Sequence, residues 1–197
     1  MMMLGEKAFA SIEELSGQLC AMSRKIWENP EGPYQEKIAS DTCAAFLEAE
    51  GFQVERGCFG LPTALRAQWG SGHPVIGFLG EYDALPGQSQ KDVPYQEPEV
   101  PGAYGHGCGH NLLAVGMAGS AAAIKREMEE QKLSGTLVFY GCPAEEVLTG
   151  KGFMARAGAF RELDCALAWH PGRYTRASYS VCTGVNSVKY HFTGKTA

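Results

Sequence analysis

The segment PVIGFLGEYDALP at 74–86 constrains the fold more than any other part of the sequence. It begins as an unbroken apolar run and becomes polar towards its end, which predicts a strand that is buried for most of its length. Strands buried on both faces are typical of parallel sheets, because the helices that connect parallel strands cover both sides. The segment therefore predicts a domain that combines a parallel sheet with helices.

The rest of the chain alternates between helical and extended patterns. Helices are expected at about 9–28, 35–50, 111–132 and 150–160. Strands are expected at about 52–56, 63–69, 136–146 and 165–171, and a long loop at 87–104. The first helix carries a capping-box-like pattern, Ser11-x-x-Glu14, and should stop at Asn29-Pro30. This alternation predicts an α/β fold, a mostly parallel sheet with helices on both faces.

The last twenty residues, 178–197, follow a different pattern. Val188, Tyr190 and Phe192 alternate with polar residues, which predicts a strand with one buried face. We expect this strand to open a second, antiparallel unit. Because nothing follows with which it could pair, we also expect the chain to be a truncated protein.

Composition excludes several classes of partner. The formal net charge is −5, the pI is near 5.6, and basic residues do not cluster, which argues against nucleic acid and anionic membranes as partners. No apolar run approaches the ~20 residues of a membrane span, and the first residues do not resemble a signal peptide. The seven cysteines are an odd number scattered through the predicted elements, so we expect reduced thiols and a cytoplasmic protein.

Polar side chains follow three of the predicted strands. Glu81 and Asp83 follow the first, Glu145 and Glu146 the second, and His170 ends the third. The carboxyl ends of parallel strands meet at one edge of a sheet, which is where open α/β sheets bind their ligands. These side chains are therefore expected to converge.

The stretch GAYGHGCGHN at 102–111 adds a thiol and imidazoles at the start of the predicted helix 111–132. Cys108 and His110 are alternate residues, so in an extended backbone both could reach one ion. Alone, Cys108-Gly-His110 is more often an ordinary glycine-rich turn, and Trp169-His170-Pro171 more often holds a core histidine. Together with the carboxylates, however, this inventory suits a divalent metal such as zinc.

Four motifs together also resemble a known family. GEYDALP at 80–86, GHGCGHN at 105–111, PAEE at 143–146 and WHP at 169–171 resemble, in order and spacing, the di-metal amidohydrolase branch of the aminoacylase/carboxypeptidase peptidase family. The resemblance covers roughly residues 20–197. It implies that 1–173 are the N-terminal part of a metal-dependent catalytic domain, and that 174–197 begin an α+β dimerisation (lid) domain that is cut short.

The resemblance also implies roles for single residues. It makes Glu145 the general base and Asp83 a catalytic-site group that orients a ligand. It makes four residues ligands of one or two divalent ions, zinc or manganese: Cys108, His110, Glu146 and His170. In more distant relatives a histidine ligand stands at the position of Glu81, and the family's last metal-binding histidine lies downstream of this chain. The truncated chain alone is therefore expected to be inactive.

The implied reaction is hydrolysis of the amide bond of N-acyl or N-aroyl amino acids, p-aminobenzoyl-glutamate-like compounds among them, or of short peptides. The full-length protein is expected to be a homodimer or a hetero-oligomer. Two alternatives stay open. Cys108 could be the nucleophile of a cysteine amidase, with His110 or His106 as its base. The chain could also be a non-catalytic metal-binding fragment.

Overall fold

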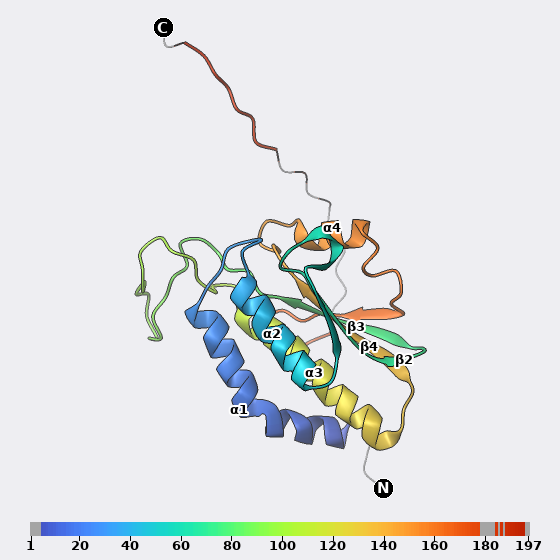
Figure 1. Cartoon of the computed structure of the whole chain (residues 1–197). Coiled ribbons are helices and arrows are strands. Elements are labelled where there is room, and N and C mark those ends of the chain that lie inside the picture. The colour runs from blue at the N-terminus through green and yellow to red at the C-terminus, as the bar shows by residue number, and fades with distance from the viewer. Residues whose placement is uncertain (1–4, 178–183, 185, 187, 196–197) are drawn as a thin grey trace.

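The computed structural model describes residues 5–177, 184, 186 and 188–195 (Figure 1). Its helices are α1 (Glu6–Glu28), α2 (Lys37–Ala49), α3 (His110–Gln131) and α4 (Gly150–Arg156), with a short 3-10 turn at Cys58–Gly60. Its strands are β1 (Gln53–Arg56), β2 (Leu65–Ser71), β3 (Val75–Glu81), β4 (Gly135–Cys142) and β5 (Cys165–Leu167). These elements confirm the predicted alternation, with shorter strands than the sequence suggested.

The five strands form one sheet in the order β1-β2-β4-β3-β5. β3 runs parallel to both β4 and β5, whereas β2 is antiparallel to β4 and to β1. Consequently β2 runs against the common direction of the other described strands. This confirms the predicted α/β fold with a mostly parallel sheet, and it brings the carboxyl ends of β3, β4 and β5 to one edge.

Helices cover the two faces of the sheet. α1, α2 and α3 pack on one face, where Phe78 of β3 and Phe139 of β4 lie in the main hydrophobic core. α4 lies on the opposite face, and its Met154 packs near Val138 and Tyr140 of β4 (Figure 1). Both β3 and β4 are therefore covered on both sides, as the unbroken apolar run predicted.

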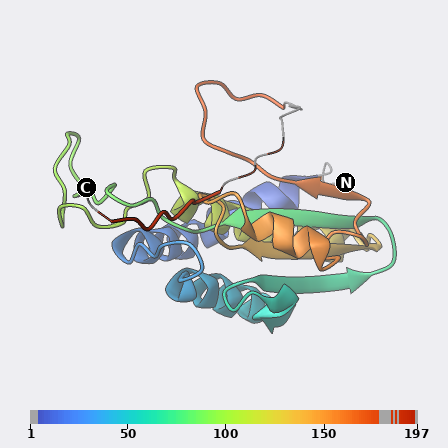
Figure 2. The same ribbon diagram turned by 90° about the horizontal axis from the view of Figure 1, so that it is seen from above.

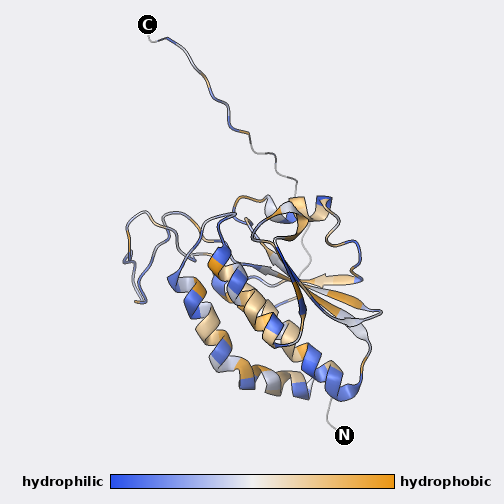
Figure 3. Cartoon of the chain, viewed as in Figure 1, coloured by the Kyte–Doolittle hydropathy of each residue, from blue (hydrophilic) through white to orange (hydrophobic). Residues whose placement is uncertain are grey.

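α3 is the central helix and carries the glycine-rich stretch at its beginning. Gly109, the residue before α3, has a φ of +77°, a left-handed conformation that glycine adopts without the clash of a Cβ atom. The helix ends in the charged segment KREMEEQ, which is hydrophilic in Figure 3. The loop at 87–104 projects from the same end of the molecule as the start of α3 (Figure 2).

The predicted capping box at Ser11 is wrong. α1 begins at Glu6, and Ser11 lies inside the helix with its side chain buried. The carboxylate of Glu127, from α3, accepts a hydrogen bond from the Ala8 N–H at 2.9 Å. A side chain distant in sequence therefore satisfies a free N–H group in the first turn of α1.

The predicted second unit stays largely untested. Residues 178–183, 185, 187, 196 and 197 lie outside the described residues, and 188–195 form no strand, with Val188, Tyr190 and Phe192 exposed. The boundary between 1–173 and 174–197 therefore remains a prediction. Among the described residues, no helix combines the length and the apolar character needed to cross a membrane.

Candidate metal centre

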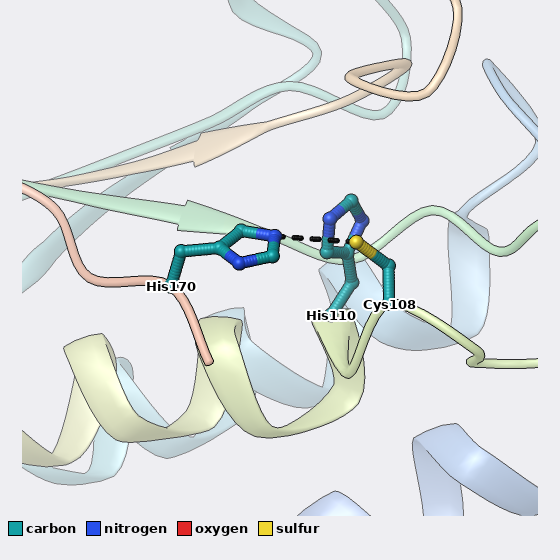
Figure 4. Close-up of side chains that lie close together, drawn as sticks. All are labelled: Cys108, His110 and His170. Carbon is teal, nitrogen blue, oxygen red and sulfur yellow. Dashed lines mark hydrogen bonds between the residues drawn. The ribbon is translucent and has the colours of Figure 1, made fainter. Parts of the chain in front are cut away.

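A cluster of thiol and imidazole groups lies at the edge of the sheet where β3, β4 and β5 end. Cys108 precedes α3, His110 is its first residue, and His170 follows β5. The Cys108 Sγ lies 3.2 Å from the His170 Nε2, and Figure 4 shows these two side chains pointing toward each other beside His110. One donor atom from each of the three residues lies within 4.8 Å of the others. The structure thus brings together three residues that the sequence analysis singled out.

His110 is held in one orientation by Asp83. Its ring is fully buried, and its Nδ1 lies 3.0 Å from both the Oδ1 and the backbone carbonyl oxygen of Asp83. Since both oxygens are acceptors, Nδ1 carries the proton and donates it. The Nε2 atom is buried and has no hydrogen-bond partner in the described part of the chain. Asp83 therefore leaves the Nε2 lone pair of His110 available.

Three carboxylates surround the Nε2 atom of His110. The nearest oxygens of Glu81, Glu146 and Glu145 lie 3.3, 3.8 and 3.9 Å from it, respectively. The Oε1 atom of Glu146 is also buried without a hydrogen-bond partner among the described residues. Buried polar atoms normally have partners, so two such atoms facing each other indicate a place for a bound group.

The charges of this site shift the pKa values of its members. Burial lowers the pKa of His110, but the hydrogen bond to Asp83 and the negative charges of Asp83, Glu81 and Glu146 outweigh it and raise the pKa above its usual value. Burial raises the pKa of the Glu146 carboxyl, and the neighbouring Asp83 charge adds to this. The site thus concentrates negative charge where water is partly excluded.

Asp83 also connects the two parts of the site. Its second oxygen, Oδ2, accepts a hydrogen bond from the Glu146 N–H at 2.8 Å. Because its first oxygen binds His110, this one buried carboxylate ties the start of α3 to the loop after β4. The geometry matches the orienting role expected of Asp83 from the sequence.

Lys151, in the first turn of α4, is a member of the site that the sequence analysis missed. Its Nζ donates to the Glu81 carboxylate at 2.5 Å and lies 4.0 Å from the Glu145 carboxylate. α4 can start this close because of Gly150, where an added Cβ would lie 1.6 Å from the carbonyl oxygen of Pro143. A lysine outside the four motifs carried no signal of this contact in the sequence.

The residues present fit a divalent cation. Two donor groups share His110, one with Cys108 and His170 and the other with Glu81 and Glu145. Thiolate, imidazole and carboxylate donors together are what zinc and similar borderline metals take. The unpartnered atoms of His110 and Glu146 point to the same conclusion.

Comparison with known proteins identifies the family. The sequence profile described as "Peptidase family M20/M25/M40" matches residues 77–194, more than half of the chain. The chain belongs to this family. The family resemblance inferred from the four motifs is thereby confirmed, and so are the metal-dependent hydrolases among its relatives.

Two curated relatives of this M20 chain have named activities. One of the two subunits of the p-aminobenzoyl-glutamate hydrolase of Escherichia coli is 47% identical over 148 residues, which are 75% of this chain and 31% of the relative. Xaa-Arg dipeptidase of Mus musculus is 33% identical over 209 residues, which cover 99% of this chain and 44% of the relative. The chain thus spans less than half the length of the curated relatives it matches.

A solved M20 structure has the same fold. The YXEP protein of Bacillus subtilis, described as a dinuclear metal-binding peptidase, matches with a TM-score of 0.69 and 27% identity. The match covers 81% of this chain and 44% of that structure. The likeness confirms that the described α/β layers belong to an M20 catalytic domain.

The surroundings of Cys108 bear on the cysteine-nucleophile alternative. Burial and the charges of Glu146, Glu145 and Glu81 raise the pKa of its thiol to about 11. A nucleophilic cysteine requires the opposite, a lowered pKa, whereas a bound divalent cation favours the thiolate. His106, one of the two bases considered for that alternative, lies in a cavity of ≈ 670 Å³ under the 87–104 loop. Burial lowers the pKa of His106 to about 4.

Proposed function

We propose that the protein is a metal-dependent amidohydrolase that cleaves the amide bond of N-acyl or N-aroyl amino acids or short peptides. The observation that carries this proposal is the Nε2 atom of His110, which is buried, unpartnered in the described structure, and surrounded by Cys108, His170 and three glutamates. Membership of the M20 family supports the same reaction class.

Four residues would hold the metal: Cys108, His110, Glu146 and His170. Each offers at least one donor atom at the edge of the sheet, and the donor set suits zinc or manganese, with one or two ions per subunit. When bound, a divalent metal supplies a water of lowered pKa and polarises the scissile carbonyl group.

Glu145 acts as the general base in this proposal. Its carboxylate faces the site, 3.9 Å from the His110 Nε2, and is partly exposed, so it can meet an attacking water. Glu145 accepts a proton from that water and returns it to the departing amide nitrogen. Asp83 keeps His110 in the tautomer with a free Nε2.

The proposed substrate class follows from the relatives. One is a p-aminobenzoyl-glutamate hydrolase and another an Xaa-Arg dipeptidase, so both act beside an amino acid linked through an amide. We extend this class to the present protein, together with a homodimeric or hetero-oligomeric assembly and a cytoplasmic location.

Native mass spectrometry and a hydrolysis assay test the proposal. Metal content is measured on the 197-residue chain, and turnover of p-aminobenzoyl-glutamate and N-acyl amino acids on the full length that its gene encodes. We expect bound divalent ions, and turnover that a chelator abolishes and added Zn²⁺ or Mn²⁺ restores. A chain that binds neither ion would refute the metal centre.

The same assay separates this mechanism from the cysteine amidase. A thiol enzyme would keep its activity in the chelator and lose it to iodoacetamide in the absence of metal. The proposed enzyme shows the reverse dependence on the chelator, and metal bound to Cys108 should slow alkylation of that thiol.

A further inference from the structure

We propose that residues 29–36, the segment between α1 and α2, form a positioning element of the metal centre that acts through the buried carboxylate of Glu36. This inference rests on the proposed function. Glu36 contacts none of the proposed ligands; instead it holds Ala144, the residue directly before Glu145 and Glu146. It is therefore a positioning residue rather than a catalytic one.

Glu36 is fully buried and accepts three hydrogen bonds. Its Oε1 accepts from the backbone N–H groups of Tyr34 and Ala144, both at 2.8 Å. Its Oε2 accepts from the hydroxyl group of Thr63 at 2.7 Å. A buried carboxylate needs such donors, so this arrangement binds three separate segments to one point.

Two of these donors belong to residues in an unfavourable backbone conformation. Tyr34 has a φ of +64° and Ala144 a φ of +55°, which places both in the left-handed region that side chains with a Cβ atom rarely adopt. Such conformations persist only where the surrounding structure enforces them. The carboxylate of Glu36 supplies that enforcement at Ala144, and the direction in which Glu145 and Glu146 leave β4 depends on it.

The segment has a second attachment on the other side of the site. The carbonyl oxygen of Glu31 accepts a hydrogen bond from the N–H of Ala84, the residue after Asp83, at 2.8 Å. The carboxylate of Glu31 accepts from the N–H groups of Ile38 and Ala39 at 3.0 and 3.1 Å, which anchors the segment on the first turn of α2. The segment thus joins the loops after β3 and β4.

A third contact reaches the start of α4. The hydroxyl groups of Tyr34 and Thr149 are hydrogen-bonded at 2.6 Å, two residues before Lys151. The segment therefore touches each loop that supplies a carboxylate to the site. Removing its central carboxylate should loosen the loop after β4 more than any other part of the fold.

The test compares Zn²⁺ affinity and amide hydrogen exchange in three variants of the chain. Glu36→Ala removes all three hydrogen bonds, and we expect about tenfold weaker Zn²⁺ binding and faster exchange of the Glu146 N–H. Glu36→Gln keeps an acceptor for Ala144 and can donate to the Thr63 hydroxyl oxygen. It should therefore bind Zn²⁺ nearly as well as the wild type.

Glu127→Ala is the matched control. Glu127 is likewise a buried carboxylate that accepts a backbone N–H, but it lies on α3 about 25 Å along the helix from His110. Its loss should lower the melting temperature without changing Zn²⁺ affinity. A merely structural role for Glu36 predicts that both alanine variants behave alike.

Several outcomes overturn the proposal. One is wild-type Zn²⁺ affinity in folded Glu36→Ala, and another is equal weakening in Glu127→Ala. If Glu36→Ala does not fold, Thr63→Val decides, because it removes only one anchor of the carboxylate; unchanged affinity and Glu146 exchange in that variant would refute positioning. A wild-type chain that binds no metal refutes the proposed function instead, so the two failures are distinguishable.

Discussion

The two halves of the metal centre differ in how firmly the protein holds them. In the thiol–imidazole half, Cys108 and His170 contact each other at 3.2 Å, and His170 is exposed with its Nδ1 near only the adjacent carbonyl group of Pro171. In the carboxylate half, Lys151 holds Glu81, and Asp83 holds the backbone of Glu146.

This difference shows which half is prepared before a metal binds. The carboxylate half is fixed by hydrogen bonds from other elements, so little order has to be gained on binding. The His170 side of the other half depends on the ion itself to hold it, because its partners are local. Only His110 belongs to both halves, and it is also the most buried of these residues.

The largest expected effect follows from replacing that shared residue. His110→Ala should abolish measurable Zn²⁺ binding, because both halves lose the central donor at once. Isothermal titration with Zn²⁺ measures the loss. The control is His73→Ala, since His73 is exposed, pairs with Asp164 and should leave binding unchanged. Retained binding in His110→Ala would show that the halves act independently.

Glu145→Gln should separate binding from turnover within the carboxylate half. The amide keeps the shape of the side chain but cannot accept the proton, so we expect wild-type metal content and turnover reduced about 10²- to 10⁴-fold. Native mass spectrometry and initial rates on the full-length protein check both parts. Undiminished activity would remove Glu145 as the base.

Cys108→Ser tests the less fixed half. Replacing a soft thiolate by a hydroxyl should weaken Zn²⁺ binding by about tenfold to 100-fold and shift the preference towards Mn²⁺. Competition between the two ions, followed by native mass spectrometry, measures the shift. Equal losses for both ions would mean that Cys108 contributes little to the choice of metal.

Lys151→Met should have the smallest effect, with the opposite sign. It removes a positive charge that competes with the cation for Glu81 and Glu145, so Zn²⁺ should bind about threefold tighter. Lys37→Met, which removes an equally charged but exposed side chain on α2, is the control. Weaker binding in Lys151→Met would show that Lys151 orders the carboxylates more than it repels the ion.

The sequence predicted those parts of the site that depend on strand direction. The apolar run before Glu81 correctly predicted a buried parallel strand, and parallel strands place Glu81, Asp83, Glu145 and His170 at one edge. The glycine-rich stretch was correctly placed at the start of a helix. These features are written in the local pattern of each segment.

The contacts that support the site were not predictable in this way. Glu36 lies 108 residues before the Ala144 N–H it accepts, and Lys151 lies 70 residues after Glu81. Neither side chain stands in a motif, and only the folded chain brings them close. The capping box at Ser11 failed for the same reason, because Glu127 of α3 stabilises an earlier start of α1.

The close approach at Gly150 has a consequence for mutational scanning. A side chain there would collide with the carbonyl group of Pro143, two residues before Glu145. A saturation library selected for activity should therefore reject nearly every substitution at this position. In such data Gly150 would be as intolerant as the proposed base, although it carries no functional group, and ranking positions by intolerance alone would assign it a chemical role that it does not have.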